Sequence, residues 1–188
     1  MKKTLISGSA LSLLLLLNGC KKDNPTPVNE EELITTVQLI FQEEGGMSSD
    51  TFSFKDIDGV GGIAAVTDSI ILKKRYRNIV QTRVLDANTS PAGTITAEIL
   101  EEGTEHQFFY QSTPADFINN FEYLDEDDNG FPIGLEFGCN TKNAAATGTL
   151  RVTLRHEPVK DAANVINNDI TNANGETDIE IDFPARWY

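Results

Sequence analysis

Apolar side chains recur at every second position along most of this chain, and this period constrains the fold more than any other sequence feature. Alternation of this kind places apolar residues on one face of a β-strand and polar residues on the other. The stretch from Leu150 to Leu154 is a clear case, because Leu150, Val152 and Leu154 alternate with Arg151 and Thr153. The chain is therefore expected to form strands that each bury one face.

Eight segments share this pattern, and turns rich in Gly, Asn and Asp separate them. They predict a single all-β domain over residues 33–188, an antiparallel immunoglobulin-like β-sandwich of about eight strands. The inward residues of the eight segments are Leu33, Val37, Leu39 and Phe41; Phe52 and Phe54; Tyr76, Val80 and Val84; Phe108 and Tyr110; Phe117, Phe121 and Tyr123; Ile133, Leu135 and Phe137; Leu150, Val152 and Leu154; Ile179, Ile181 and Phe183.

One short helix interrupts the strands. Thr94 or Thr96 can cap its start, Glu98 suits its N-terminal turn, and Gly103 can end it in the left-handed conformation. The side chains expected to face the sheet are Ile95, Ile99 and Leu100.

The first nineteen residues have the pattern of a secretion signal. Lys2 and Lys3 precede an apolar run from Leu5 to Leu17, and this run is shorter than the roughly 20 residues that cross a bilayer. The sequence Leu17-Asn18-Gly19-Cys20 resembles the lipobox of bacterial lipoproteins. That resemblance implies removal of residues 1–19, fatty acylation of Cys20 (palmitate among its acyl chains) and anchoring in the membrane. An ordinary secretory signal with a chance cysteine is the alternative.

The segment after the cysteine is polar and contains two prolines, so residues 20–32 are predicted to form a flexible tether to the lipidated end. Lys21, rather than aspartate, follows Cys20, and among lipoproteins this implies delivery to the outer membrane. Whether the domain faces the periplasm or the cell surface stays open.

The chain is strongly acidic. Without Lys2 and Lys3 it carries 13 basic and 29 acidic side chains, a formal charge of −16. Such a surface repels nucleic acid and favours cations or basic partners, so a nucleic-acid partner is not expected. If lipid occupies Cys20, Cys139 has no partner for a disulfide, and it falls in the inward phase of its strand. Cys139 is predicted to be a small buried apolar residue.

Known catalytic patterns are missing from the sequence. It contains no Gly-x-Ser-x-Gly, Ser-x-x-Lys or His-Glu-x-x-His motif, and only His106 and His156 could serve as imidazole bases. We therefore expect a binding protein rather than an enzyme.

The most specific motif is an acidic turn from Asp125 to Gly130. Together with Glu136 it matches the spacing of a calcium loop, with Asp125, Asp127, Asn129 and Glu136 at the ligand positions. The flanking segments alternate as strands, and Asn129-Gly130 is also a favoured hairpin turn. A plain acidic turn is the alternative to calcium.

The two histidines offer a second possible metal or ligand site. His106 follows Glu105 where the helix gives way to a strand, and His156 ends a strand before Glu157. If these strand ends meet, two imidazoles and two carboxylates could hold zinc. Their separation in sequence does not show whether they meet, and two histidines at the rim of the core are the alternative.

Several segments together resemble a family of small Bacteroidota outer-membrane lipoproteins, sometimes labelled with a type 1 periplasmic binding fold. The matching segments are 32–37, 56–59, 105–110, 154–158 and 175–179. The label would imply two α/β lobes, which this short alternating chain contradicts. The resemblance implies an accessory binding role in uptake beside a TonB-dependent receptor. A calcium-stabilised structural or adhesive surface module is the alternative function.

Overall fold

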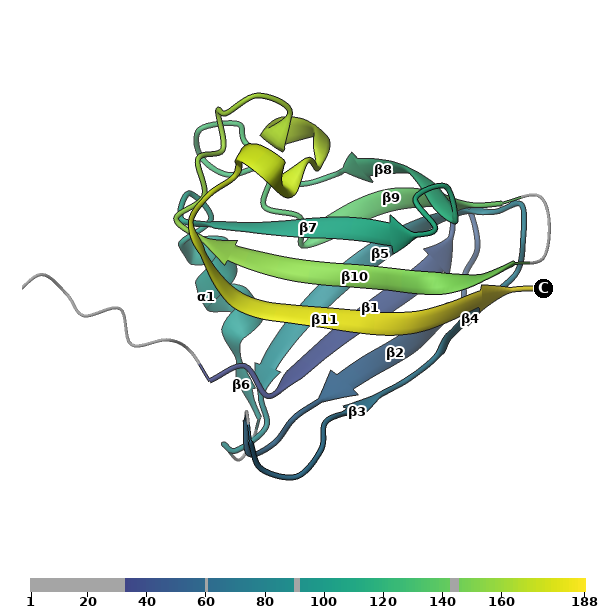
Figure 1. The fold of residues 1–188 in the computed structure, drawn as a ribbon, viewed down its shortest axis with the longest axis horizontal. Coiled ribbons are helices and arrows are strands. Elements are labelled where there is room, and N and C mark those ends of the chain that lie inside the picture. The colour runs from purple at the N-terminus through teal and green to yellow at the C-terminus, as the bar shows by residue number, and fades with distance from the viewer. Residues whose placement is uncertain (1–32, 60, 90–91, 143–145) are drawn as a thin grey trace, which may run out of the picture. The chain divides into compact units, whose positions relative to one another are not determined.

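Two β-sheets face each other across one apolar core in the computed structural model, which describes residues 33–59, 61–89, 92–142 and 146–188 (Figure 1). This arrangement confirms the predicted β-sandwich. The predicted signal peptide, Cys20 and the tether up to residue 32 lie outside the described residues. Within the described part of the chain, no helix has the length and apolar character needed to cross a bilayer.

The larger sheet has seven strands, in the order β3-β2-β1-β5-β9-β8, with β6 paired to β5. All pairs within it are antiparallel. Its strands are β1 (Thr36–Glu43), β2 (Ser49–Lys55), β3 (Val66–Thr67), β5 (Arg77–Asp86), β6 (Gly93–Thr94), β8 (Ile118–Tyr123) and β9 (Glu136–Thr141).

The smaller sheet has four strands, in the order β4-β11-β10-β7. The long β10–β11 hairpin and the β10–β7 pair are antiparallel, whereas the short β4 runs parallel to β11. Its strands are β4 (Ile70–Leu72), β7 (His106–Thr113), β10 (Ala146–His156) and β11 (Glu176–Trp187).

The core forms where the alternating apolar faces of the two sheets meet. Val80 and Val84 from the larger sheet and Val152 and Phe183 from the smaller sheet are fully buried in one cluster. Burial of each such side chain contributes about 1.5–3 kcal/mol. Cys139 belongs to the same cluster and is 1% exposed, which confirms its predicted place.

Helix α1 (Ile95–Glu101) lies where one short helix was predicted. Ile95 and Ile99 are buried as expected, but Leu100 is 58% exposed and does not face the sheet. The helix ends on Glu102 rather than on a left-handed Gly103. Thr96 does not cap the helix, because its hydroxyl bonds to the backbone of Val84 in β5.

Some predicted strand boundaries were wrong. Leu33 and Tyr76 precede β1 and β5, and both are largely exposed. Ile133 and Leu135 are buried, yet they lie before β9 in irregular backbone. In this segment the amides of Gly134 and Glu136 donate to the Asp125 carboxylate, whereas the carbonyls of Ile133 and Leu135 accept from the amides of Phe108 and Thr82.

The long connection between β10 and β11 is ordered and covers the outer face of β7 (Figure 1). It contains two 3-10 helices, η1 (Val165–Asn167) and η2 (Ile170–Asn172), and buries Phe109 against Val165 and Ala173. The Asn168 amide accepts from the backbone N–H of Tyr110 and donates to its carbonyl, at 2.8 and 2.5 Å. It thereby satisfies backbone groups on the outer edge of the sheet.

Candidate metal centre

The two histidines meet at one end of the smaller sheet. Strands β7 and β10 pair so that His106 and His156 lie directly opposite each other. Both residues are in the inward phase of their strands, which His106 shares with Phe108 in β7 and His156 shares with Leu154 in β10. Side chains on the same face of neighbouring antiparallel strands are close enough to touch, so the strand register joins two residues 50 positions apart.

The imidazole rings are in direct contact. Nδ1 of His156 lies 3.1 Å from Nε2 of His106, and the ring centroids are 4.8 Å apart in an edge-to-face arrangement. His106 is 4% exposed. The pair therefore presents two nitrogens to one small volume at the margin of the core.

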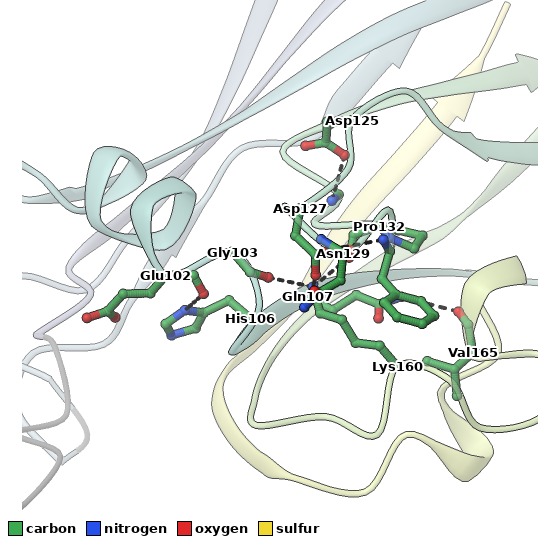
Figure 2. A network of polar contacts seen from close by, with 12 residues as sticks. Glu102, Gly103, His106, Gln107, Asp125, Asp127, Asn129, Pro132, Lys160 and Val165 are labelled. Carbon is green, nitrogen blue, oxygen red and sulfur yellow. Dashed lines mark hydrogen bonds and ion pairs between the residues drawn. The ribbon is translucent and has the colours of Figure 1, made fainter.

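The backbone orients the ring of His106. Its Nδ1 lies 3.2 Å from the carbonyl oxygen of Glu102, at the end of α1 (Figure 2). A carbonyl oxygen can only accept, so in a neutral imidazole Nδ1 carries the proton and Nε2 has the lone pair. A histidine that binds a metal through one ring nitrogen usually donates the N–H of the other nitrogen to a backbone carbonyl, a carboxylate or water.

A β-bulge brings a carboxylate to the same place. Leu154 pairs with Ile179 and Arg155 pairs with Thr177, so Asp178 is an extra residue in β11. Bulges turn the inserted side chain away from the regular alternation. The Asp178 Oδ2 atom lies 3.9 Å from Nε2 of His106, and the side chain is 19% exposed.

Two groups of possible ligands share His156. One contains His106, His156 and Asp178, and the other contains Glu105, His156 and Glu157; within each group the ligand atoms lie within 4.8 Å of one another. All four residues expected to form this site are therefore brought together, and Asp178 joins them. The Glu157 amide donates to the carbonyl of Glu105 at 2.6 Å, which ties the ends of the two strands.

Backbone geometry holds Glu157 in position. Glu157 is in the left-handed region at φ 47°, and Gly175 packs against it at φ 72°. A Cβ atom on Gly175 would lie 2.3 Å from the carbonyl oxygen of His156 and 3.0 Å from the carbonyl carbon of Glu157. Only glycine allows this approach, by which the long connection returns to the start of β11.

The imidazoles of His106 and His156 and the carboxylate of Asp178, whose ligand atoms lie within 4.8 Å of one another, match the ligands that a divalent transition metal takes. Ligand nitrogens in a tetrahedral zinc site are roughly 3.3 Å apart, close to the 3.1 Å between the two rings. The Asp178 carboxylate would have to move about 0.6 Å closer to reach the same spacing. Imidazole and carboxylate together suit zinc, copper or nickel better than calcium.

The acidic turn is built differently from a calcium loop. Asp125 accepts the amides of Gly134 and Glu136, and one Asp127 oxygen accepts the amides of Asn129 and Phe131. Asp125, Asp127 and Glu136 do not form a three-ligand group among the described residues. The geometry therefore gives no support to the calcium prediction for Asp125, Asp127, Asn129 and Glu136, and it favours a hydrogen-bonded turn.

A lysine provides the cation in that turn (Figure 2). The Lys160 ammonium donates to Oδ2 of Asp127 at 2.9 Å and to the carbonyls of Gly103 and Pro132 at 2.5 and 2.9 Å. Burial opposes ionisation of Asp127, but the hydrogen bonds from Lys160 and two backbone amides outweigh it and hold the pKa of Asp127 below its usual value. Lys160 thereby attaches the long connection to the segment between α1 and β7.

Sequence reasoning missed Asp178 and Lys160. Asp178 shares the outward phase of Glu180 and Asp182, which pair with Arg151 on the sheet surface, and nothing local distinguishes it from them. Lys160 stands in a segment rich in Asn and Asp, where a solvated lysine is the ordinary expectation. Lys160 is the only lysine or arginine between Glu157 and Glu176, and this was the available signal.

The comparisons with known proteins add no relative: no protein family, curated protein or solved structure matches this chain.

Proposed function

We propose that this domain is a non-catalytic binding module that takes up a divalent transition-metal ion, zinc above all, between His106, His156 and Asp178. The observation that carries this proposal is the 3.1 Å contact between Nδ1 of His156 and Nε2 of His106, beside the Asp178 carboxylate. Glu105 and Glu157 form a second group of possible ligands with the same His156.

The charge of the chain and the support of His106 agree with this role. A formal charge of −14 draws cations toward the surface. The Glu102 carbonyl already selects the tautomer of His106 that leaves Nε2 for a metal. A hydrogen-bonded histidine pair that only stabilises the strand ends is the competing explanation.

The first experiment is a calorimetric titration of the purified protein with zinc, and separately with calcium. We expect one zinc ion per chain with a Kd of about 1 µM, equivalent to about −8 kcal/mol, and no comparable calcium binding. His156→Gln and Asp178→Asn should each weaken zinc binding at least tenfold, because each removes one ligand. The matched control is Asp50→Asn, which removes an exposed carboxylate from β2 in the other sheet.

Cobalt(II) distinguishes ligation from general attraction to negative charge. A cobalt complex with imidazole and carboxylate in a tetrahedral site should absorb in the visible region, and the band should be lost in His156→Gln. Zinc binding weaker than about 100 µM, or affinity equal in His156→Gln and the wild type, would refute the metal site.

The lipobox resemblance extends this proposal to the place of action. A lipid on Cys20 would hold the domain at the outer membrane, where metal capture could serve uptake beside a TonB-dependent receptor. Radiolabelled palmitate fed to the expressing bacterium should enter the wild-type protein and not the Cys20→Ala variant. Labelling of both, or of neither, would contradict a lipid anchor at Cys20.

A further inference from the structure

A cavity opens at the end of the sandwich opposite to the metal centre, and its lining differs in charge from the rest of the chain. Lys142 lines this cavity, and β10 begins four residues later. The same strand ends at His156 in the metal centre, so the two sites lie near opposite ends of β10 (Figure 1). The cavity measures about 320 Å³, and it lies where β5 and β8 begin and β9 ends. Its polar lining includes Arg75, Arg77, Lys142, Asn119, Asn120 and Asn140.

The lining is basic in an acidic protein. Three of the 15 lysine and arginine residues of the chain meet here, and no carboxylate residue is among those that line the cavity in the described part of the chain. Arg77 pairs with Glu44 and Glu122, and Lys142 pairs with Asp116. Arg75 makes no ion pair with any described residue, so its guanidinium is the group best placed to meet an anion.

Strained backbone shapes two sides of the cavity. Arg75 is held in the left-handed region at φ 71°, and Asn120 is held there at φ 54°. The pairing of β8 with β9 is also shifted between Asn119 and Glu122, which forms a bulge at the same point. A left-handed conformation is unfavourable for arginine, whereas asparagine tolerates it, and non-glycine residues held in this region cluster at binding sites.

The turn that carries Arg75 is fastened to the end of β9. The Thr141 hydroxyl accepts from the amide of Tyr76 at 3.1 Å and lies 3.0 Å from the carbonyl oxygen of Lys73, to which it can donate. The Arg75 amide itself donates to the carbonyl of Lys142 at 3.2 Å. The backbone of this turn is thus held in place before any ligand arrives, which lowers the backbone entropy lost on binding.

From these features we infer that the cavity binds a small hydroxylated carboxylate of monosaccharide size, such as a hexuronate. A guanidinium pairs with a carboxylate through two parallel hydrogen bonds, and the three asparagine amides can each donate to and accept from sugar hydroxyls. The volume is at the lower end of the range for ligand pockets. This site is independent of the metal centre and of the function proposed for it.

The test compares glucuronate and galacturonate with the neutral sugars glucose and galactose and with inorganic phosphate, using calorimetry or NMR titration of the purified protein. We expect at least one of the two uronates to bind with a Kd of about 1 mM. The neutral sugars and phosphate should bind at least tenfold more weakly. Zinc should leave this binding unchanged, since the two sites lie at opposite ends of the sandwich.

Arg75→Gly separates binding from folding. Glycine accepts a positive φ without strain, so this variant should unfold at the same temperature as the wild type or higher, while uronate binding falls at least tenfold. Arg83→Ala removes the same charge from an exposed position on β5 and should bind as the wild type does. Uronate binding weaker than about 10 mM, equal binding of neutral sugar or phosphate, or full binding by Arg75→Gly would overturn the inference.

Discussion

The buried Lys160–Asp127 pair gives the sharpest stability prediction in this structure. The side chains of Lys160 and Asp127 are only 5% and 1% exposed. All three ammonium protons have acceptors, namely Asp127 and the carbonyls of Gly103 and Pro132. Lys160→Met keeps the aliphatic stem, and it leaves one buried carboxylate without its cation and two carbonyls without their donor.

We expect Lys160→Met to lower the free energy of unfolding by about 4 kcal/mol. Removal of one partner of a buried ion pair costs about 3–5 kcal/mol. Two backbone amides still bond Asp127 Oδ1, which moves the loss toward the lower limit, whereas the two orphaned carbonyls move it upward. In the double variant Lys160→Met with Asp127→Asn, the uncompensated charge disappears, so about 2 kcal/mol should be recovered.

Urea unfolding followed by circular dichroism measures these losses. The matched control is Lys73→Met, because Lys73 pairs with Glu43 on the surface with side chains 56% and 34% exposed. An exposed pair contributes about 0–1 kcal/mol. A loss below about 1 kcal/mol for Lys160→Met, equal to that of the control, would show that this ion pair does not hold the long connection in place.

Three further predictions concern Gly175, Cys139 and Asp127. Gly175→Ala should lower the free energy of unfolding by about 2 kcal/mol or more and weaken zinc binding, since its Cβ would overlap the carbonyl of His156. The control is Gly130→Ala, which is also at positive φ but has nothing within 4 Å and should lower it by only about 1 kcal/mol. Equal losses of stability in thermal unfolding would contradict this prediction. Burial raises the pKa of Cys139 to about 12, and the thiolate is the form that reacts with iodoacetamide. At pH 8, iodoacetamide should therefore label Cys139 in urea but not in the native protein. Rapid labelling of the native protein would refute the burial of this thiol. The pKa of Asp127 is lowered in the folded protein. Its ionised form therefore stabilises the fold at pH values above its ordinary pKa of about 3.9, and this contribution is lost as the pH falls through the folded pKa. Asp127→Asn should reduce the loss of stability at acid pH, and an unchanged loss would exclude this carboxylate as its cause.

The strand faces could be read from the sequence because alternation is a local property. Val80, Val84 and Cys139 were expected inside and are buried, since the direction of a side chain in a strand depends on its position in the two-residue period. The errors lie at strand ends: Leu33 and Tyr76 are exposed, because pairing stops where no neighbouring strand supplies hydrogen bonds, and the period alone does not show this.

The candidate metal centre depended on tertiary structure. His106 and His156 could be named as candidates from sequence, but only the register of β7 and β10 places them opposite each other. Asp178 reaches them through a bulge, and Lys160 pairs with Asp127 in the acidic turn. Register and bulges are set by the summed free energy of contacts between distant segments, whereas the period of apolar residues is set within each segment. The sequence by itself therefore determined which faces are buried and which chemical groups are available, and the tertiary structure decided which of those groups meet.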